Sequence, residues 1–156
     1  MKKLFQSSAV ALLLVPTGGF AQDLRPISEY LSIPEARREA AYPILRCMGL
    51  FRGMFYYGGV NFSEEDTLRT QLSIESMGLI ALLLRQEKHP EIDLNELASQ
   101  IGKDVEGMSV IYSERMKKNF SLTGEAWGSD ATIMGDFETC GPIAQKSVDS
   151  VSKMGG

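Results

Sequence analysis

The chain has 156 residues, with 16 basic and 20 acidic side chains, a single histidine and a formal charge of −4. This acidic balance argues against nucleic acid as a partner, because binding to phosphates requires a clustered positive surface. One histidine and two cysteines exclude zinc sites built from several histidines or from four cysteines, and we predict neither a metal ion nor a cofactor.

Residues 1–21 have the pattern of a secretory signal peptide. Two lysines precede an apolar run from about Ala9 to Val15, and cleavage is expected after Ala21. The run is shorter than the roughly 20 residues that a membrane-spanning helix needs, so we expect no stable membrane insertion after cleavage. The short, lysine-led form is typical of a bacterial Sec-type signal and predicts a periplasmic or secreted protein. Its removal would leave 14 basic and 20 acidic side chains, a formal charge of −6.

Residues 22–156 are predicted to form a single all-α domain. Apolar residues recur at a spacing near 3.6, and no stretch alternates strictly between apolar and polar residues. The expected architecture is a four-helix bundle in which neighbours in the chain run antiparallel. Residues 22–31 are expected to be loosely held. The four helices are expected over residues 34–57, 63–88, 93–120 and 130–153.

The first expected helix, 34–57, carries one of the two cysteines, Cys47, at the centre of its apolar face. Ser32 is expected to cap this helix, and Pro43 to kink it because proline lacks an amide donor. Gly49 and Gly53 lie four residues apart on the back of the helix. We expect them to allow close packing on another helix or simply to be tolerated, rather than to form a membrane dimerisation face.

The second expected helix, 63–88, has an acidic residue within an apolar stripe. Glu75 lies in the middle of this stripe, and a carboxylate buried there must find a partner or keep its proton. Arg115 and Arg46 are the candidate ion-pair partners. A proton-handling role for Glu75 and an acid facing a surface groove remain as alternatives. The stripe consists of Leu68, Leu72, Leu79, Leu82 and Leu83.

The second cysteine, Cys140, is central on the apolar face of the last expected helix, 130–153. Cysteines centred on two inward faces fit a bridge between the first and last helices, whereas a reactive thiolate needs partial exposure and nearby positive charge. An oxidising compartment favours such a bridge. We therefore predict a Cys47–Cys140 disulfide.

The sequence favours a protein that binds another protein in the cell envelope or outside it and performs no chemistry. The lone His89 stands at a helix end before Pro90, where no catalytic set is spaced to use it. The candidate interaction surface consists of Trp127, Tyr56 and Tyr57, although Trp127 could instead cover the end of the core.

One form of such a protein is an inhibitor or immunity-type protein of a periplasmic or extracellular enzyme. The first alternative is a small-molecule or lipid carrier with a cavity between the helices, lined by some of the eight methionines. The second alternative is an enzyme that uses a buried carboxylate at Glu75.

Overall fold

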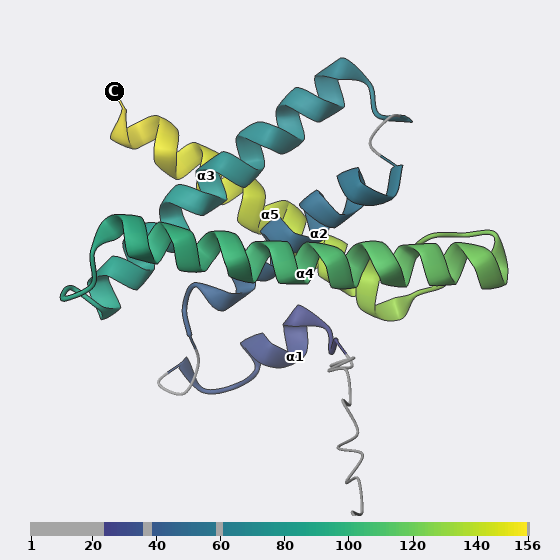
Figure 1. The fold of residues 1–156 in the computed structure, drawn as a ribbon, viewed down its shortest axis with the longest axis horizontal. Helices are drawn as coiled ribbons and strands as arrows, with labels where there is room; N and C mark the ends of the chain where they lie inside the picture. Colours follow the sequence, from purple (N-terminus) through teal and green to yellow (C-terminus); the bar gives the residue numbers. More distant parts are fainter. Residues whose placement is uncertain (1–23, 36–38, 59–60, 156) are drawn as a thin grey trace, which may run out of the picture.

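The computed structural model describes residues 24–35, 39–58 and 61–155. Five helices account for the regular structure in these ranges, which confirms the all-α class (Figure 1). No helix within these ranges is both long and apolar enough to cross a membrane. The expected signal peptide, residues 1–21, lies outside them. The helices are α1 (Ile27–Leu31), α2 (Tyr42–Gly58), α3 (Glu64–Lys88), α4 (Leu94–Thr123) and α5 (Ala131–Met154).

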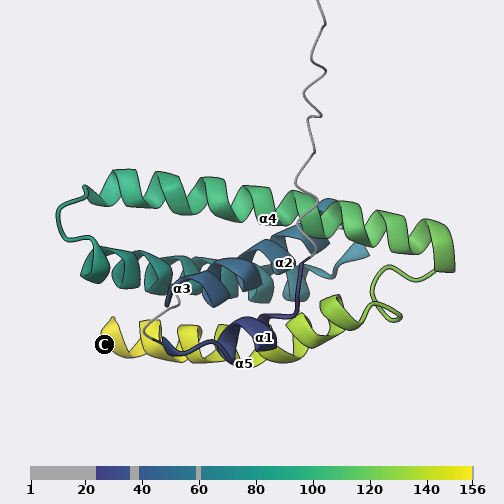
Figure 2. The ribbon, with the colours of Figure 1, turned by 90° about the horizontal axis from the view of Figure 1, so that it is seen from below.

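The four long helices alternate in direction along the chain, as predicted, but chain neighbours do not form the closest pairs. The most extensive contact joins α2 to α4, and the next joins α3 to α5. Figure 2 shows α4 along one side of the molecule and α5 along the other, with α2 between them. Because α2 and α4 point the same way, the core is organised around a parallel pair of helices.

Helix α2 is the central helix of the fold. Residues 45–50 are all buried, which is possible only for a helix that is covered on every side. Two glycines permit this: a Cβ atom on Gly49 would lie 2.5 Å from the Cβ atom of Met108, and one on Gly53 would lie 2.8 Å from that of Tyr112. The expected close packing of Gly49 and Gly53 on another helix is therefore confirmed.

The prediction of one long first helix, 34–57, was wrong. Helix α2 begins only at Tyr42, so Pro43 occupies its first turn, where the missing amide donor has no helical partner to lose and no kink results. Ser32 does not cap that helix but ends α1 instead. Ile27 of α1 is fully buried, so the expectation that residues 22–31 are loosely held was wrong for the part that the structure describes.

The other helix ends follow the local chemistry of the sequence. The side chains of Ser63, Asp93 and Asp130 cap α3, α4 and α5 by accepting backbone hydrogen bonds. Helix α4 continues to Thr123, three residues beyond the expected end. It stops where Gly124 adopts a φ of 77°, a conformation that glycine takes without strain.

Candidate functional site

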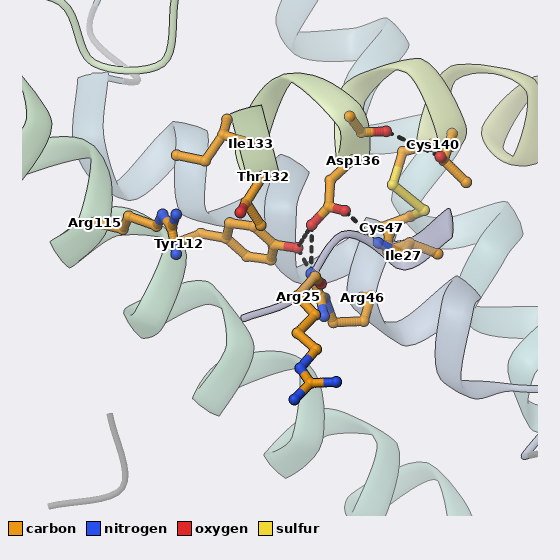
Figure 3. Close-up of polar contacts among 12 residues, drawn as sticks. Arg25, Ile27, Arg46, Cys47, Tyr112, Arg115, Thr132, Ile133, Asp136 and Cys140 are labelled. Carbon is orange, nitrogen blue, oxygen red and sulfur yellow. Dashed lines mark hydrogen bonds and ion pairs between the residues drawn. A yellow bond between two sulfur atoms is a disulfide. The ribbon is translucent and has the colours of Figure 1, made fainter. Parts of the chain in front are cut away.

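The carboxylate of Asp136 is fully buried inside the fold. It forms an ion pair with Arg46 and accepts hydrogen bonds from the Tyr112 hydroxyl and from the backbone N–H of Ile27, the last at 2.7 Å. These four residues come from α5, α2, α4 and α1. Figure 3 shows the three side chains pointing towards one another. The interaction therefore ties together four of the five helices.

The guanidinium of Arg46 is satisfied on several sides. Its Nε donates to the Tyr112 hydroxyl at 2.9 Å, and its Nη2 donates to the backbone carbonyl of Arg25 at 3.1 Å. The Nη1 donates to the Tyr42 hydroxyl at 3.3 Å. The ion pair with Asp136 thus has the additional hydrogen bonds that a buried charge pair requires.

The electrostatics of this network shift the pKa values of Tyr112 and Arg46. Burial raises the pKa of the Tyr112 phenol, and the Asp136 carboxylate raises it further against the opposing effect of Arg46. Burial alone would lower the pKa of Arg46, but Tyr112, Tyr42 and Asp136 together raise it. Tyr112 therefore stays a neutral donor and Arg46 a cation.

The predicted disulfide is confirmed, and it lies beside this network. Cys47 and Cys140 are bonded across 93 residues with their Cα atoms 5.2 Å apart, linking α2 to α5. Both cysteines are fully buried. Cys47 follows Arg46 directly and Cys140 lies one helical turn after Asp136, so the covalent link and the ion pair join the same two helices at the same level (Figure 3).

An open groove of about 690 Å³ runs along the outer side of the network, between α1 and the start of α2. Its wall includes Arg25, Tyr30, Tyr42 and Arg46. The expected lining by methionines is not found there. Instead Met48, Met77 and Met116 are buried, and Met54 and Met108 pack against the same apolar core.

A second polar cluster holds the loop before α5. The Asp130 carboxylate accepts hydrogen bonds from Arg115 Nε at 2.6 Å and from Asn119 Nδ2 at 2.8 Å, and it caps α5 through the N–H groups of Thr132 and Ile133. Partial burial acts to raise the pKa of Asp130, but the hydrogen bonds from Arg115, Asn119 and Ile133 outweigh it and lower the pKa to about 2.

The prediction of a buried acid at Glu75 was wrong. Glu75 is exposed and accepts a hydrogen bond from Gln71 Nε2 at 3.1 Å. It lines an open surface groove with Arg52 and Phe55 of α2, which is the alternative of an acid facing a surface groove. The two expected partners form other ion pairs, Arg115 with Asp130 and Arg46 with Asp136. Helix α3 packs against the core mainly through Met77 and Ala81, and Leu68, Leu72, Leu79 and Leu83 of the leucine stripe are exposed. Its buried residues are Ser76, Met77 and Ala81.

Of the three residues of the candidate interaction surface, Trp127 and Tyr57 lie together and Tyr56 does not. Trp127 contacts Tyr57 and Phe137 edge-on, with ring centres 6.1 Å apart in each case. Phe120 of α4 also contacts Tyr57 edge-on, with ring centres 6.3 Å apart. We call these four residues, Tyr57, Phe120, Trp127 and Phe137, the aromatic end.

Tyr56 lies apart from the aromatic end. Its hydroxyl accepts from Arg52 Nε and donates to Glu106 on α4. Trp127 is half-buried and packs against the core, which is the alternative role that the sequence left open for it.

Comparison with known protein families, with curated proteins and with solved structures found no match. Within the described ranges, no group of three or more histidine, cysteine, aspartate or glutamate side chains is placed to hold a metal ion.

Asp136 is the central residue that sequence reasoning missed. It lies three residues after Ile133 and four before Cys140, so it falls on the buried face of α5 at helical spacing. An acid at a core position of the last helix and Arg46 beside Cys47 on the first were both visible in the sequence. The apolar spacing of the helix includes Phe137, and this pattern did not single out the neighbouring Asp136 as a buried position.

Proposed function

We propose that this protein is an exported, non-catalytic protein that acts by binding another protein in the cell envelope or outside it. The observation that carries the proposal is the exposure of Phe120, at 54%, beside the half-buried ring of Tyr57, which in turn packs against the half-buried ring of Trp127. Aromatic side chains backed by a packed core lose little conformational freedom on binding, and they are common anchors of protein interfaces.

The polar groups support binding rather than catalysis. Asp136, Arg46 and Tyr112 are buried and hydrogen-bonded to one another, and the Asp130 carboxylate is occupied as a helix cap. An enzyme needs ionisable groups that converge on a space open to substrate. The carboxylates that the described fold buries are instead used to join helices.

Site-specific photo-crosslinking in the envelope of the producing cell tests this proposal. A photoreactive residue in place of Phe120 should give one discrete adduct with a partner protein. The matched control is Val110, another exposed apolar residue of α4, where no adduct is expected. Equal labelling at positions 110 and 120, or none at either, would contradict binding through the aromatic end.

The groove beside α1 favours a second candidate, the binding of a small molecule. It combines the rings of Tyr30 and Tyr42 with the cations Arg25 and Arg46, and its volume of about 690 Å³ is within the range of ligand sites. Native mass spectrometry of the mature protein tests this candidate. A stoichiometric adduct that is lost in a Tyr30→Ala variant would support it, and a mass equal to that of the bare chain would not.

A further inference from the structure

Trp127 lies in the loop between α4 and α5, residues 124–130, and is the only tryptophan of the chain. This loop has no regular secondary structure, so no helical hydrogen bonds fix the position of the ring. Trp127 is nevertheless half-buried and contacts Tyr57 and Phe137 edge-on. The side chains that hold the loop therefore determine where one side of the aromatic end is placed.

Asn119, near the end of α4, holds the loop on both sides of Trp127. Its Nδ2 donates to the backbone carbonyl of Ala126 at 3.1 Å and to the carboxylate of Asp130 at 2.8 Å. These two bonds use both hydrogens of the side-chain amide. The backbone N–H of Asp130 donates to the Trp127 carbonyl at 2.9 Å. Asn119 thus binds the residue before Trp127 and the residue that closes the turn after it.

Other polar contacts fix the two ends of the loop. The Thr123 hydroxyl accepts a hydrogen bond from the Glu125 N–H and donates one to the Glu125 carbonyl, both at 3.1 Å, which fixes the start. Arg115 donates to both oxygens of the Asp130 carboxylate, which fixes the end. Asn119 connects the middle of the loop to this end, because it bonds to Ala126 as well as to Asp130.

We propose that Asn119 is the positioning residue of the aromatic end. Its two hydrogen bonds hold Trp127 against Tyr57. Tyr57 in turn contacts the exposed Phe120, so the loop supports the ring that is offered to a partner. The assignment of a binding role to this support rests on the proposed function, whereas the placement of Trp127 by Asn119 does not.

Loss of the Asn119 amide should release the loop. Ala126 is buried, so its carbonyl can replace the lost hydrogen bond with one to water only if the loop moves outward. Trp127 would move with it and leave Tyr57 without this neighbour. A surface that is fixed before binding loses less conformational entropy on association than a mobile one. The freed loop should therefore weaken binding through the aromatic end.

Tryptophan fluorescence of the mature, disulfide-bonded protein tests the placement of Trp127 without any partner. Asn119→Ala should shift the emission to longer wavelength and increase its quenching by acrylamide. Asn119→Leu, which has a similar size and no hydrogen-bonding group, should do the same. Asn95→Ala, at an exposed asparagine of the same helix, should change neither. Circular dichroism checks that the helices are intact, and native emission from both Asn119 variants would overturn the proposal.

Competition in an extract of the cell envelope tests the consequence for binding. Purified variants compete with the chain that carries the photoreactive residue at position 120, and the concentration that halves the adduct is measured. Asn119→Ala should require about two to ten times more protein than the native chain, and Asn95→Ala the same amount. Equal competition by Asn119→Ala would overturn the positioning role alone. Equal competition by Phe120→Ala would instead contradict the proposed function and leave the fluorescence result standing.

Discussion

The Asp136 carboxylate on α5 accepts a hydrogen bond from the backbone N–H of Ile27, 109 residues earlier in the chain, at 2.7 Å. The same carboxylate pairs with Arg46. One side chain therefore fixes both the short N-terminal helix and the central helix to the last helix. Loss of its charge should therefore weaken the attachment of α1 and α2 to α5.

Asp136→Asn should lower the free energy of unfolding by about 3–5 kcal/mol, because it leaves the buried Arg46 without a counter-charge. Urea unfolding followed by circular dichroism measures this change. The matched control is Asp149→Asn, at an exposed acid of the same helix, which should change stability by less than about 0.5 kcal/mol. Similar small effects of both variants would show that the ion pair contributes little.

Gly49→Ala should destabilise the fold by about 1–3 kcal/mol. The added methyl group would lie 2.5 Å from Met108 Cβ, an atom fixed to the backbone of α4 that cannot turn away. Gly102→Ala, where nothing lies within 4 Å of the added atom, should instead stabilise α4 by about 0.5–1 kcal/mol. Thermal unfolding of the two variants compares them directly, and equal midpoints would contradict the close approach of α2 and α4.

Asp130 should make stability depend on pH in acid. Its pKa is lowered from an ordinary value of 3.8 to about 2 in the folded chain, so the unfolded chain binds the proton first as the pH falls. The stabilisation is complete above about pH 5 and is lost as the pH falls towards 2, by about 1–2 kcal/mol in total. Asp130→Asn should show a flatter stability curve than the native chain between pH 5 and 2, and parallel curves would refute this assignment.

Reduction of the Cys47–Cys140 bond should lower the free energy of unfolding by about 2–5 kcal/mol, because the bond closes a loop of 93 residues. Urea unfolding with and without a reductant measures the difference. A variant with alanine at both positions should have the same urea midpoint with and without the reductant. This midpoint should match that of the reduced native chain. An unchanged midpoint on reduction would mean that the noncovalent contacts alone determine the stability.

The disulfide could be predicted because two cysteines occupied the centres of apolar stripes in a chain with a signal-like start. The helix starts at Ser63, Asp93 and Asp130 could also be predicted, since capping is a local property of the sequence. The start of α2 could not be predicted. Apolar spacing continued upstream of Tyr42, where α2 begins, and Pro43 is compatible with either a kink or a first turn.

Helix α3 shows why burial was harder to predict than helicity. Both of its faces carry apolar residues, so the pattern alone could not say which one packs inside. In the structure Ser76, Met77 and Ala81 are buried, and Glu75 and four of the leucines are exposed. For the same reason the partner of Arg46 was assigned to the wrong acid.

The complete burial of Cys47 and Cys140 has a consequence for the biogenesis of the protein. An oxidoreductase can reach these sulfur atoms only while α5 is still separated from α2, and a reductant can reach them only when the helices part again. The bond must therefore be made during maturation. In the finished molecule, the rate at which it is reduced will report how often the interior opens.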